Sequence, residues 1–97
     1  MLGINEARYV GSYNIQLSFN NGKEGIADLK ETIFNDKRPI FSKLKSQADF
    51  SNFTVNHSTV VWPNGLDMAP EYLFYLAFKE STDADCQSQF RCWGYIT

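Results

Sequence analysis

The chain has 97 residues, of which 43% are hydrophobic and 21% charged, and its formal net charge is −2 at pH 7. These values predict one small globular domain and exclude a disordered chain. The acidic balance disfavours direct nucleic-acid binding, which usually requires a basic surface. The longest apolar run, Tyr72 to Phe78, is too short to span a membrane. Because the N-terminus has no signal-peptide pattern, we expect a cytoplasmic protein.

The first third of the chain predicts three consecutive strands. Tyr13 to Phe19 alternates apolar and polar residues, which is the pattern of a half-buried strand. Asn20-Asn21-Gly22 follows, and Asn-Gly supplies the positive φ angles of a tight hairpin turn. Lys23 to Leu29 is therefore expected to return as a strand, and Ile4 to Val10 to precede both. Together they predict an antiparallel meander.

The middle of the chain predicts a connector, a short helix and a second hairpin. Leu29 to Arg38 is polar and mixed, so we expect a connector, and Pro39 can open a helix because its missing N–H would be unpaired there. A second hairpin is expected from 53–55 and 59–62, turned by residues 56–58, with a further turn at Pro63-Asn64-Gly65. The side chains expected to reach the core in this region are Ile40, Phe41, Leu44, Phe50 and Phe53.

The main helix is expected at residues 70–80, beginning at Pro70. A surface helix normally keeps one polar face, but Tyr72 to Phe78 contains no charged residue. We therefore expect this helix to be buried on more than one side, with Phe74 and Phe78 toward its flank. A second copy of the chain or the C-terminal residues would cover that flank. The sequence predicts a homodimer with the aromatic helix or the tail at its interface.

Residues 1–80 are expected to form a single α+β domain: a small antiparallel sheet of about five strands packed against one main helix and a short helix. Residues 81–97 form a C-terminal tail that is polar and then aromatic. Ser81 to Gln89 is expected to be mobile. Phe90 to Ile96 is expected to fold back as a strand or to dock on a neighbouring molecule.

Residues that usually carry catalysis or bind metal are sparse. The chain has one histidine, His57, and two cysteines, Cys86 and Cys92, whose spacing matches no common zinc or redox motif. Both cysteines are expected to be free thiols, and no metal, cofactor or catalytic residue is predicted. Asp67 and Glu71 flank the start of the main helix. Paired carboxylates there could support acid–base chemistry, but the favoured interpretation is that Asp67 accepts backbone N–H groups of the corner.

Two blocks of the sequence resemble a known family. The first block is Tyr13-x-Ile15-x-Leu17-x-Phe19-x-x-Gly22-x-x-Gly25-x-x-Asp28-Leu29. The second block is Val60-x-Trp62-Pro63-Asn64-Gly65-x-Asp67-x-Ala69-Pro70-Glu71-x-Leu73. Over roughly Ile4 to Lys79 the chain resembles the bacterial domain of unknown function 2442 family. The resemblance implies a small α+β domain with no established activity. Some members are fused to a helix-turn-helix domain, and others are encoded beside a second small protein, which implies a toxin–antitoxin-like or regulatory pair.

Two functions are compatible with these patterns. The first is a non-enzymatic protein-interaction or regulatory module that pairs with itself or with a small protein partner. The alternative is a small-ligand binder or enzyme that uses the corner from Trp62 to Glu71. A deep cleft shared by Asp67 and Glu71 would favour the alternative, and an aromatic surface would favour the first. The candidate binding residues are Trp62, Asn64, Gly65, Asp67, Glu71, Phe74 and Phe78.

Overall fold

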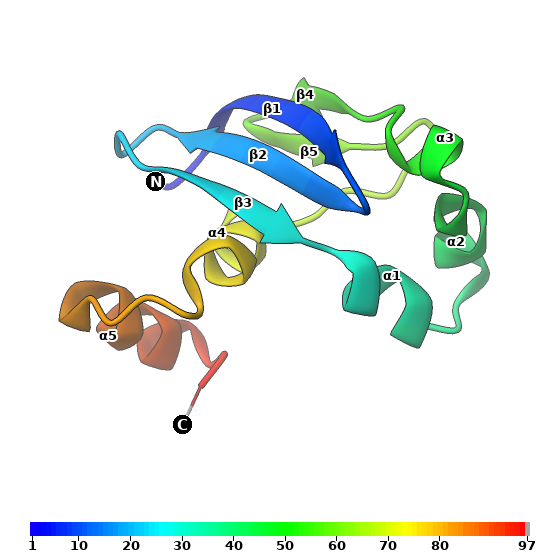
Figure 1. Ribbon diagram of the computed structural model, residues 1–97. Coiled ribbons are helices and arrows are strands. Elements are labelled where there is room, and N and C mark those ends of the chain that lie inside the picture. The colour runs from blue at the N-terminus through cyan, green and yellow to red at the C-terminus, as the bar shows by residue number, and fades with distance from the viewer. Residues whose placement is uncertain (97) are drawn as a thin grey trace.

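A three-stranded antiparallel sheet forms one side of the fold (Figure 1). In the computed structural model, which describes residues 1–96, the strands β1 (Ile4–Gly11), β2 (Asn14–Phe19) and β3 (Glu24–Asp28) lie in the order β1-β2-β3. The predicted meander is confirmed. Alternation in β2 works as expected, since Ile15, Leu17 and Phe19 are buried while the residues between them are half-exposed.

The second hairpin, β4 (Thr54–Asn56) and β5 (Thr59–Val61), is also confirmed, but it forms a separate two-stranded sheet. His57 and Ser58 take up the two positive φ angles of its tight turn. The backbone N–H of Ile4 donates to the Ser58 carbonyl at 2.8 Å, so the hairpin lies beside β1. One edge of the larger sheet is therefore covered, while β3 lies at the opposite edge (Figure 1).

Residues 30–50 contain three short α-helices, α1 (Lys30–Asn35), α2 (Pro39–Ser42) and α3 (Gln47–Phe50), with a 3₁₀ turn η1 (Lys43–Lys45) between the last two. The prediction of a helix opened by Pro39 is confirmed. The predicted connector over 29–38 is wrong, because α1 occupies most of it. Leu29 and Ile33 lie one helical turn apart and are both fully buried. Tertiary packing therefore stabilises a helix that the polar sequence does not predict.

Ile40 does not join the core as predicted. Its side chain is 37% exposed, whereas Phe41 and Leu44 are buried. The 3₁₀ turn that follows α2 has three residues per turn, which places Phe41 and Leu44 on one side and leaves Ile40 on another. Phe50 is buried and Phe53 packs partly buried against the same core, as predicted.

Two helices complete the fold, α4 (Pro70–Phe78) and α5 (Ala84–Trp93). The start of the main helix at Pro70 is confirmed. The expected strand over 90–96 is wrong, because 84–93 form α5; this helix also takes up most of the segment 81–89, and it docks on α4 of the same chain. The Asp83 carboxylate accepts a hydrogen bond from the Asp85 N–H at 2.9 Å, and the helix ends at Gly94 with φ +86°, so α5 carries its own start and stop signals.

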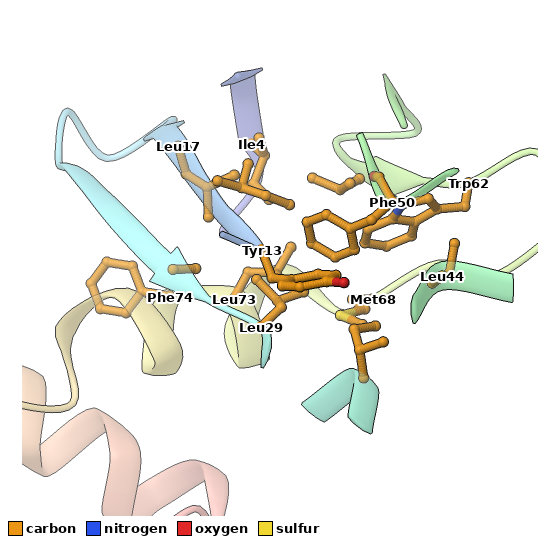
Figure 2. Packing of buried hydrophobic residues seen from close by; sticks show 14 of the residues in the cluster. Ile4, Tyr13, Leu17, Leu29, Leu44, Phe50, Trp62, Met68, Leu73 and Phe74 are labelled. Carbon is orange, nitrogen blue, oxygen red and sulfur yellow. Dashed lines mark hydrogen bonds between the residues drawn. The ribbon is translucent and has the colours of Figure 1, made fainter. Parts of the chain in front are cut away.

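The hydrophobic core runs continuously from the short helices to α5 (Figure 2). At one end Trp62 packs against Phe50 and donates its indole N–H to the Phe50 carbonyl at 2.8 Å. At the other end Phe74 lies between the sheet and α5, in contact with Phe19 and Phe90. Cys86 is buried beside this end. None of the helices within residues 1–96 has the length and apolar character needed to cross a membrane.

Candidate functional site

The predicted corner around Trp62 is a rigid turn. Gly65 has φ +92°, and its N–H donates to the Trp62 carbonyl at 3.0 Å. The Trp62 N–H in turn donates to the Leu66 carbonyl at 2.8 Å. A positive φ favours glycine, and the buried indole ring fixes the base of the turn. Trp62 and Gly65 therefore have structural tasks in the folded chain.

Asn64 joins the corner to α2. Its Nδ2 donates to the Ile40 carbonyl at 2.8 Å, and its Oδ1 accepts from the Leu66 N–H at 3.1 Å. With Pro63 it lines a small hollow of about 50 Å³. Asn64 is thus the side chain that accepts a backbone N–H of the corner, which the sequence analysis assigned to Asp67.

Asp67 does not have the predicted structural role. Its backbone forms an isolated antiparallel bridge with Val61, and its side chain is exposed. Within residues 1–96, no hydrogen bond reaches its carboxylate, and the residue that caps α4 is Ala69, without a side-chain contact. The backbone bridge already fixes this segment, so the carboxylate of Asp67 remains in solvent.

Glu71 lies in the first turn of α4 and is half-buried. Burial raises the pKa of Tyr95, and the negative charge of Glu71 raises it further. The Glu71 carboxylate thus lies near the Tyr95 phenol, which stays protonated at neutral pH because its pKa is raised.

Phe74 and Phe78 belong to the aromatic core under the sheet. Phe74 is only 1% exposed, because Phe19 of the sheet and the C-terminal helix α5 both cover it. Its ring contacts Phe90 and Trp93 of α5, each with centroids 6.1 Å away. Phe78 is half-buried and lies against Gly25 of β3. The C-terminal helix of the same chain therefore covers the aromatic helix.

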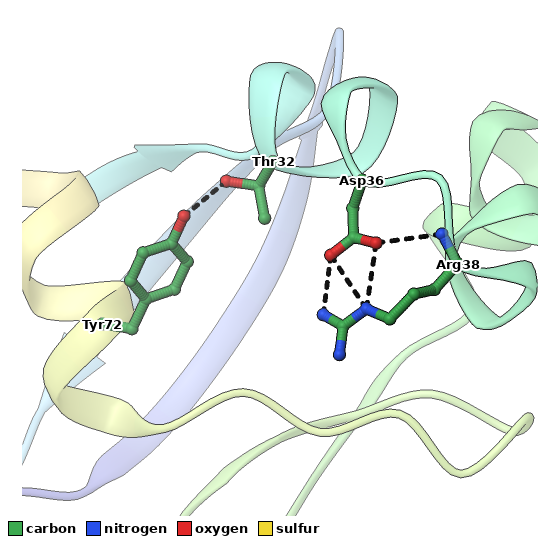
Figure 3. Close-up of polar contacts among 4 residues, drawn as sticks. All are labelled: Thr32, Asp36, Arg38 and Tyr72. Carbon is green, nitrogen blue, oxygen red and sulfur yellow. Dashed lines mark hydrogen bonds and ion pairs between the residues drawn. The ribbon is translucent and has the colours of Figure 1, made fainter.

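A groove between α1 and α4, which the sequence analysis missed, has a volume of about 580 Å³. We call it the tyrosine groove. Across it, the Tyr72 hydroxyl and the Thr32 Oγ1 lie 2.7 Å apart and share a hydrogen bond (Figure 3). The residues that line the tyrosine groove are Asp28, Lys30, Glu31, Thr32, Asn35, Tyr72, Tyr75, Leu76 and Lys79.

Three tyrosines lie together beside the groove. Tyr75 stacks on Tyr95 with ring centroids 5.0 Å apart, and Tyr72 lies 5.8 Å from Tyr95. All three are partly buried. Tyrosine combines a large apolar face with a polar end, so it serves well at surfaces that are covered by a partner. The three-residue spacing of Tyr72 and Tyr75 was a usable signal, but the groove was missed because its other wall, α1, was taken for a connector.

The outer face of the larger sheet carries a shallow depression of about 620 Å³, lined by residues that include Glu6, Arg8, Gln16, Ser18 and Glu24. Its polar groups bond to one another: Arg8 donates to Gln16 Oε1 at 2.6 Å, and Ser18 donates to Glu24 Oε1 at 3.0 Å. These polar side chains therefore find hydrogen-bond partners within the chain and do not require a ligand.

Asp67 and Glu71 do not meet in any of the concave surfaces described above. Within residues 1–96, neither lines the hollow at Asn64, the tyrosine groove or the depression on the sheet. Likewise, the side chains of residues 1–96 include no group of three His, Cys, Asp or Glu that could hold a metal ion. The predicted site residues thus do not converge on one cleft: Trp62, Asn64 and Gly65 share the corner, whereas Phe74 and Phe78 lie together under the sheet. Of the three concave surfaces, the one with aromatic walls is the tyrosine groove.

The fold and this groove define a small α+β domain with an aromatic groove beside an unpaired sheet edge. The chain belongs to the DUF2442 family, which is described as "Protein of unknown function (DUF2442)" and whose profile matches residues 4–79. The family resemblance inferred from the two sequence blocks is confirmed.

The fold is similar to the crystal structure of "Putative DNA Binding Protein NE0471" from Nitrosomonas europaea ATCC 19718, with a TM-score of 0.72 and 9% sequence identity. The similarity covers 100% of this chain and 63% of that one, so this chain spans only part of the length of that protein. At such low identity the similarity shows the fold alone. The comparison with curated proteins gives no match.

Proposed function

We propose that this chain is a small non-enzymatic protein-interaction module that binds a partner protein through the tyrosine groove. The observation that carries the proposal is the composition of the groove. Tyr72, Tyr75 and Leu76 supply an aromatic and apolar wall, and Lys30 and Lys79 are among the charged residues at its rim. Apolar centres with polar rims, enriched in tyrosine, are typical of protein interfaces.

The shape of the groove favours a protein over a small ligand. Small-molecule sites enclose most of the ligand surface, whereas this groove lies open between two helices on the surface. Its titratable side chains carry both signs, with Asp28 and Glu31 opposed to Lys30 and Lys79. Mixed charges around an apolar wall give specificity for a complementary protein surface. A regulatory or toxin–antitoxin-like pair is the form of this function that the family resemblance implies.

Direct DNA binding is not part of the proposal. The Nitrosomonas europaea protein is described as a "Putative DNA Binding Protein", but the net charge of this chain is −2. Cations are densest in residues 37–45. There the Asp36 carboxylate pairs with Arg38, with Nη2 and Oδ2 2.6 Å apart (Figure 3). This pair lowers the pKa of Asp36 below its ordinary value, mainly through the side-chain hydrogen bond, so the local positive charge is partly neutralised.

Self-association is a second form of the same function. The connection between α4 and α5, residues 79–83, is short, and α5 covers the aromatic side of α4. Exchange of α5 between two copies would keep these contacts and give a closed homodimer. Light scattering over a concentration series tests this: a dimer is expected, and a single 11.1 kDa species at high micromolar concentration contradicts it.

Affinity capture from the native host, followed by quantitative mass spectrometry, tests the proposed function. The bait variants are Leu76→Glu in the groove wall and Lys79→Glu on its exposed rim, with Val55→Glu on β4 as the matched control. Melting curves confirm that each bait is folded. A stoichiometric partner should be retained by the wild type and Val55→Glu, weakened by Lys79→Glu and lost with Leu76→Glu. Absence of any stoichiometric partner, or equal capture by all four baits, contradicts the proposal.

A further inference from the structure

The strand β3 leaves one edge of the larger sheet unpaired. The opposite edge is covered, because the β4–β5 hairpin lies beside β1 and Ser58 accepts the Ile4 N–H. On the far side of β3, no strand within residues 1–96 forms a ladder (Figure 1). An unpaired edge presents free backbone donors and acceptors, which form a template for another extended chain.

The register of the β2–β3 ladder identifies which backbone groups are free. Phe19 N donates to Lys23 O at 2.8 Å, and Leu29 N donates to Tyr13 O at 3.0 Å. Hydrogen-bonded pairs alternate with non-bonded pairs in an antiparallel ladder. In the continuous register between these two bonds, the non-bonded pairs on β3 contain Glu24, Ile26 and Asp28. Their N–H and C=O groups therefore face away from β2.

The side chains of these same three residues make an acid–apolar–acid pattern. Glu24 and Asp28 are exposed, and Ile26 between them is 53% exposed. Among the residues that the structure describes, neither carboxylate has an ion pair. The adjacent Lys23 pairs with Asp83 at 3.6 Å, and the Asp28 carboxylate accepts the backbone N–H of Lys30 at 3.0 Å. The edge thus offers two uncompensated negative charges around an apolar side chain.

This pattern decides between two occupants. A second copy of β3, paired antiparallel about Ile26, would place Glu24 opposite Asp28 of the other copy twice, and directly opposed like charges destabilise a ladder. A strand with an apolar residue opposite Ile26 and basic residues two positions before and after it would instead meet opposite charges. Charge complementarity therefore favours a basic–apolar–basic strand from a different protein.

The edge continues into the tyrosine groove. Asp28, the last residue of β3, is also part of the groove wall. A strand that runs antiparallel to β3 would approach along the groove and reach Asp28 first. An apolar residue shortly before the basic–apolar–basic segment would then lie against Tyr72, Tyr75 and Leu76.

We propose that the free edge of β3 binds an extended strand of a partner protein in which two basic residues flank an apolar residue at alternate positions. The inference rests on the proposed function, because it specifies which kind of partner segment the interaction module takes. The backbone of the edge forms the hydrogen bonds to the partner strand, and Glu24 and Asp28 select for basic side chains on it. This division between backbone and side chains is found in other cases of strand addition.

Fluorescence anisotropy with synthetic peptides tests this inference directly. The probe is Leu-Ser-Lys-Thr-Val-Thr-Lys. The first control replaces both lysines with glutamate, and the second carries an N-methyl group on the valine nitrogen. The lysine peptide should bind, and each control should bind about tenfold more weakly, which corresponds to about 1.4 kcal/mol, because the first control loses the opposite-charge pairs and the second loses a backbone hydrogen bond. Equal binding of the lysine and glutamate peptides overturns the proposal, as does binding that N-methylation leaves unchanged.

Charge reversal in the protein provides the matched test. Glu24→Lys should abolish the preference, so that the lysine and glutamate peptides bind about equally, because the reversed charge at position 24 then offsets that of Asp28. Glu6→Lys, on β1 of the same sheet, should leave the preference unchanged. An equal effect of both variants contradicts a site at β3. If the groove variants lose a captured partner while none of the peptides discriminates, the proposed function stands and this inference fails. If the peptides discriminate but no partner depends on Leu76, the proposed function of the groove fails and the strand site stands.

Discussion

Gly25 allows α4 to approach β3. A Cβ atom built at this position would lie 2.9 Å from Cζ of Phe78 and 3.3 Å from Cβ of Ala77. Gly25→Ala is expected to destabilise the protein by about 1–3 kcal/mol, because overpacking forces such neighbours to move. Chemical denaturation measures the change. In the Phe78→Leu background the same substitution should cost less, and strictly additive effects of the two changes would contradict the predicted contact.

Tyr95 is the residue whose ionisation reports the packing of the C-terminal residues. Its pKa is raised by burial first and by the Glu71 charge second. The folded chain thus favours the neutral phenol. The free energy of unfolding therefore contains a contribution from this pKa shift. The contribution is fully present below the ordinary tyrosine pKa and is lost as the pH rises through the pKa of Tyr95 in the folded chain.

An alkaline titration of phenolate absorbance tests this point. The difference between wild type and Tyr95→Phe should show a midpoint above that of an ordinary tyrosine, and Glu71→Gln should lower the midpoint. An ordinary midpoint in the difference curve, or no response to Glu71→Gln, would show that Tyr95 does not pack beside Glu71.

At the level of elements, the start of α5 depends on one carboxylate. Asp83 accepts the Asp85 N–H, so Asp83→Ala is expected to cost about 0.5–2 kcal/mol of folding free energy. Asp67→Ala, which removes a carboxylate without such a bond, should leave the free energy of unfolding nearly unchanged. Lys23→Ala is the control for the exposed Lys23–Asp83 ion pair, which should contribute little. Equal losses in Asp83→Ala and Asp67→Ala would contradict this assignment.

The elements that could be predicted from sequence are those whose signal is local. The alternation of apolar and polar residues correctly predicted β2, and Pro39 and Pro70 correctly predicted the starts of α2 and α4. Helix α1 could not be found this way, because it is short and polar and depends on a contact between Ile33 and the distant core. Helix α5 did carry local signals, an N-cap at Asp83 and a stop at Gly94. They were not used because the polar composition of 81–89 instead indicated a mobile segment.

The same limit applies to the candidate site. The corner at Trp62 was correctly predicted as a turn, but nothing in the sequence distinguishes Asn64, which makes its side-chain hydrogen bonds, from Asp67, which does not. Both are good acceptors in a turn, and the choice is made by the carbonyl of Ile40, which is remote in sequence. The tyrosine groove requires two walls from distant segments, so missing α1 meant missing the groove.

For the whole molecule, the arrangement of covered and open surfaces leaves one side free for the proposed partner. The β4–β5 hairpin covers the β1 edge, and α5 covers the aromatic side of α4. The β3 edge and the tyrosine groove remain open and meet at Asp28. The central proposal about function is therefore that the β3 edge and the tyrosine groove form one continuous binding surface.

Amide hydrogen exchange, compared between the free protein and its complex with the captured partner, tests that claim most directly. In the free protein the Ile26 amide should exchange fast although it lies in a strand, because its N–H faces the open edge. In the complex we expect slower exchange at 24–28 and 72–79, with no change at 37–45 or 63–67. Protection confined to 37–45 or to the corner at 62–67 would contradict the account.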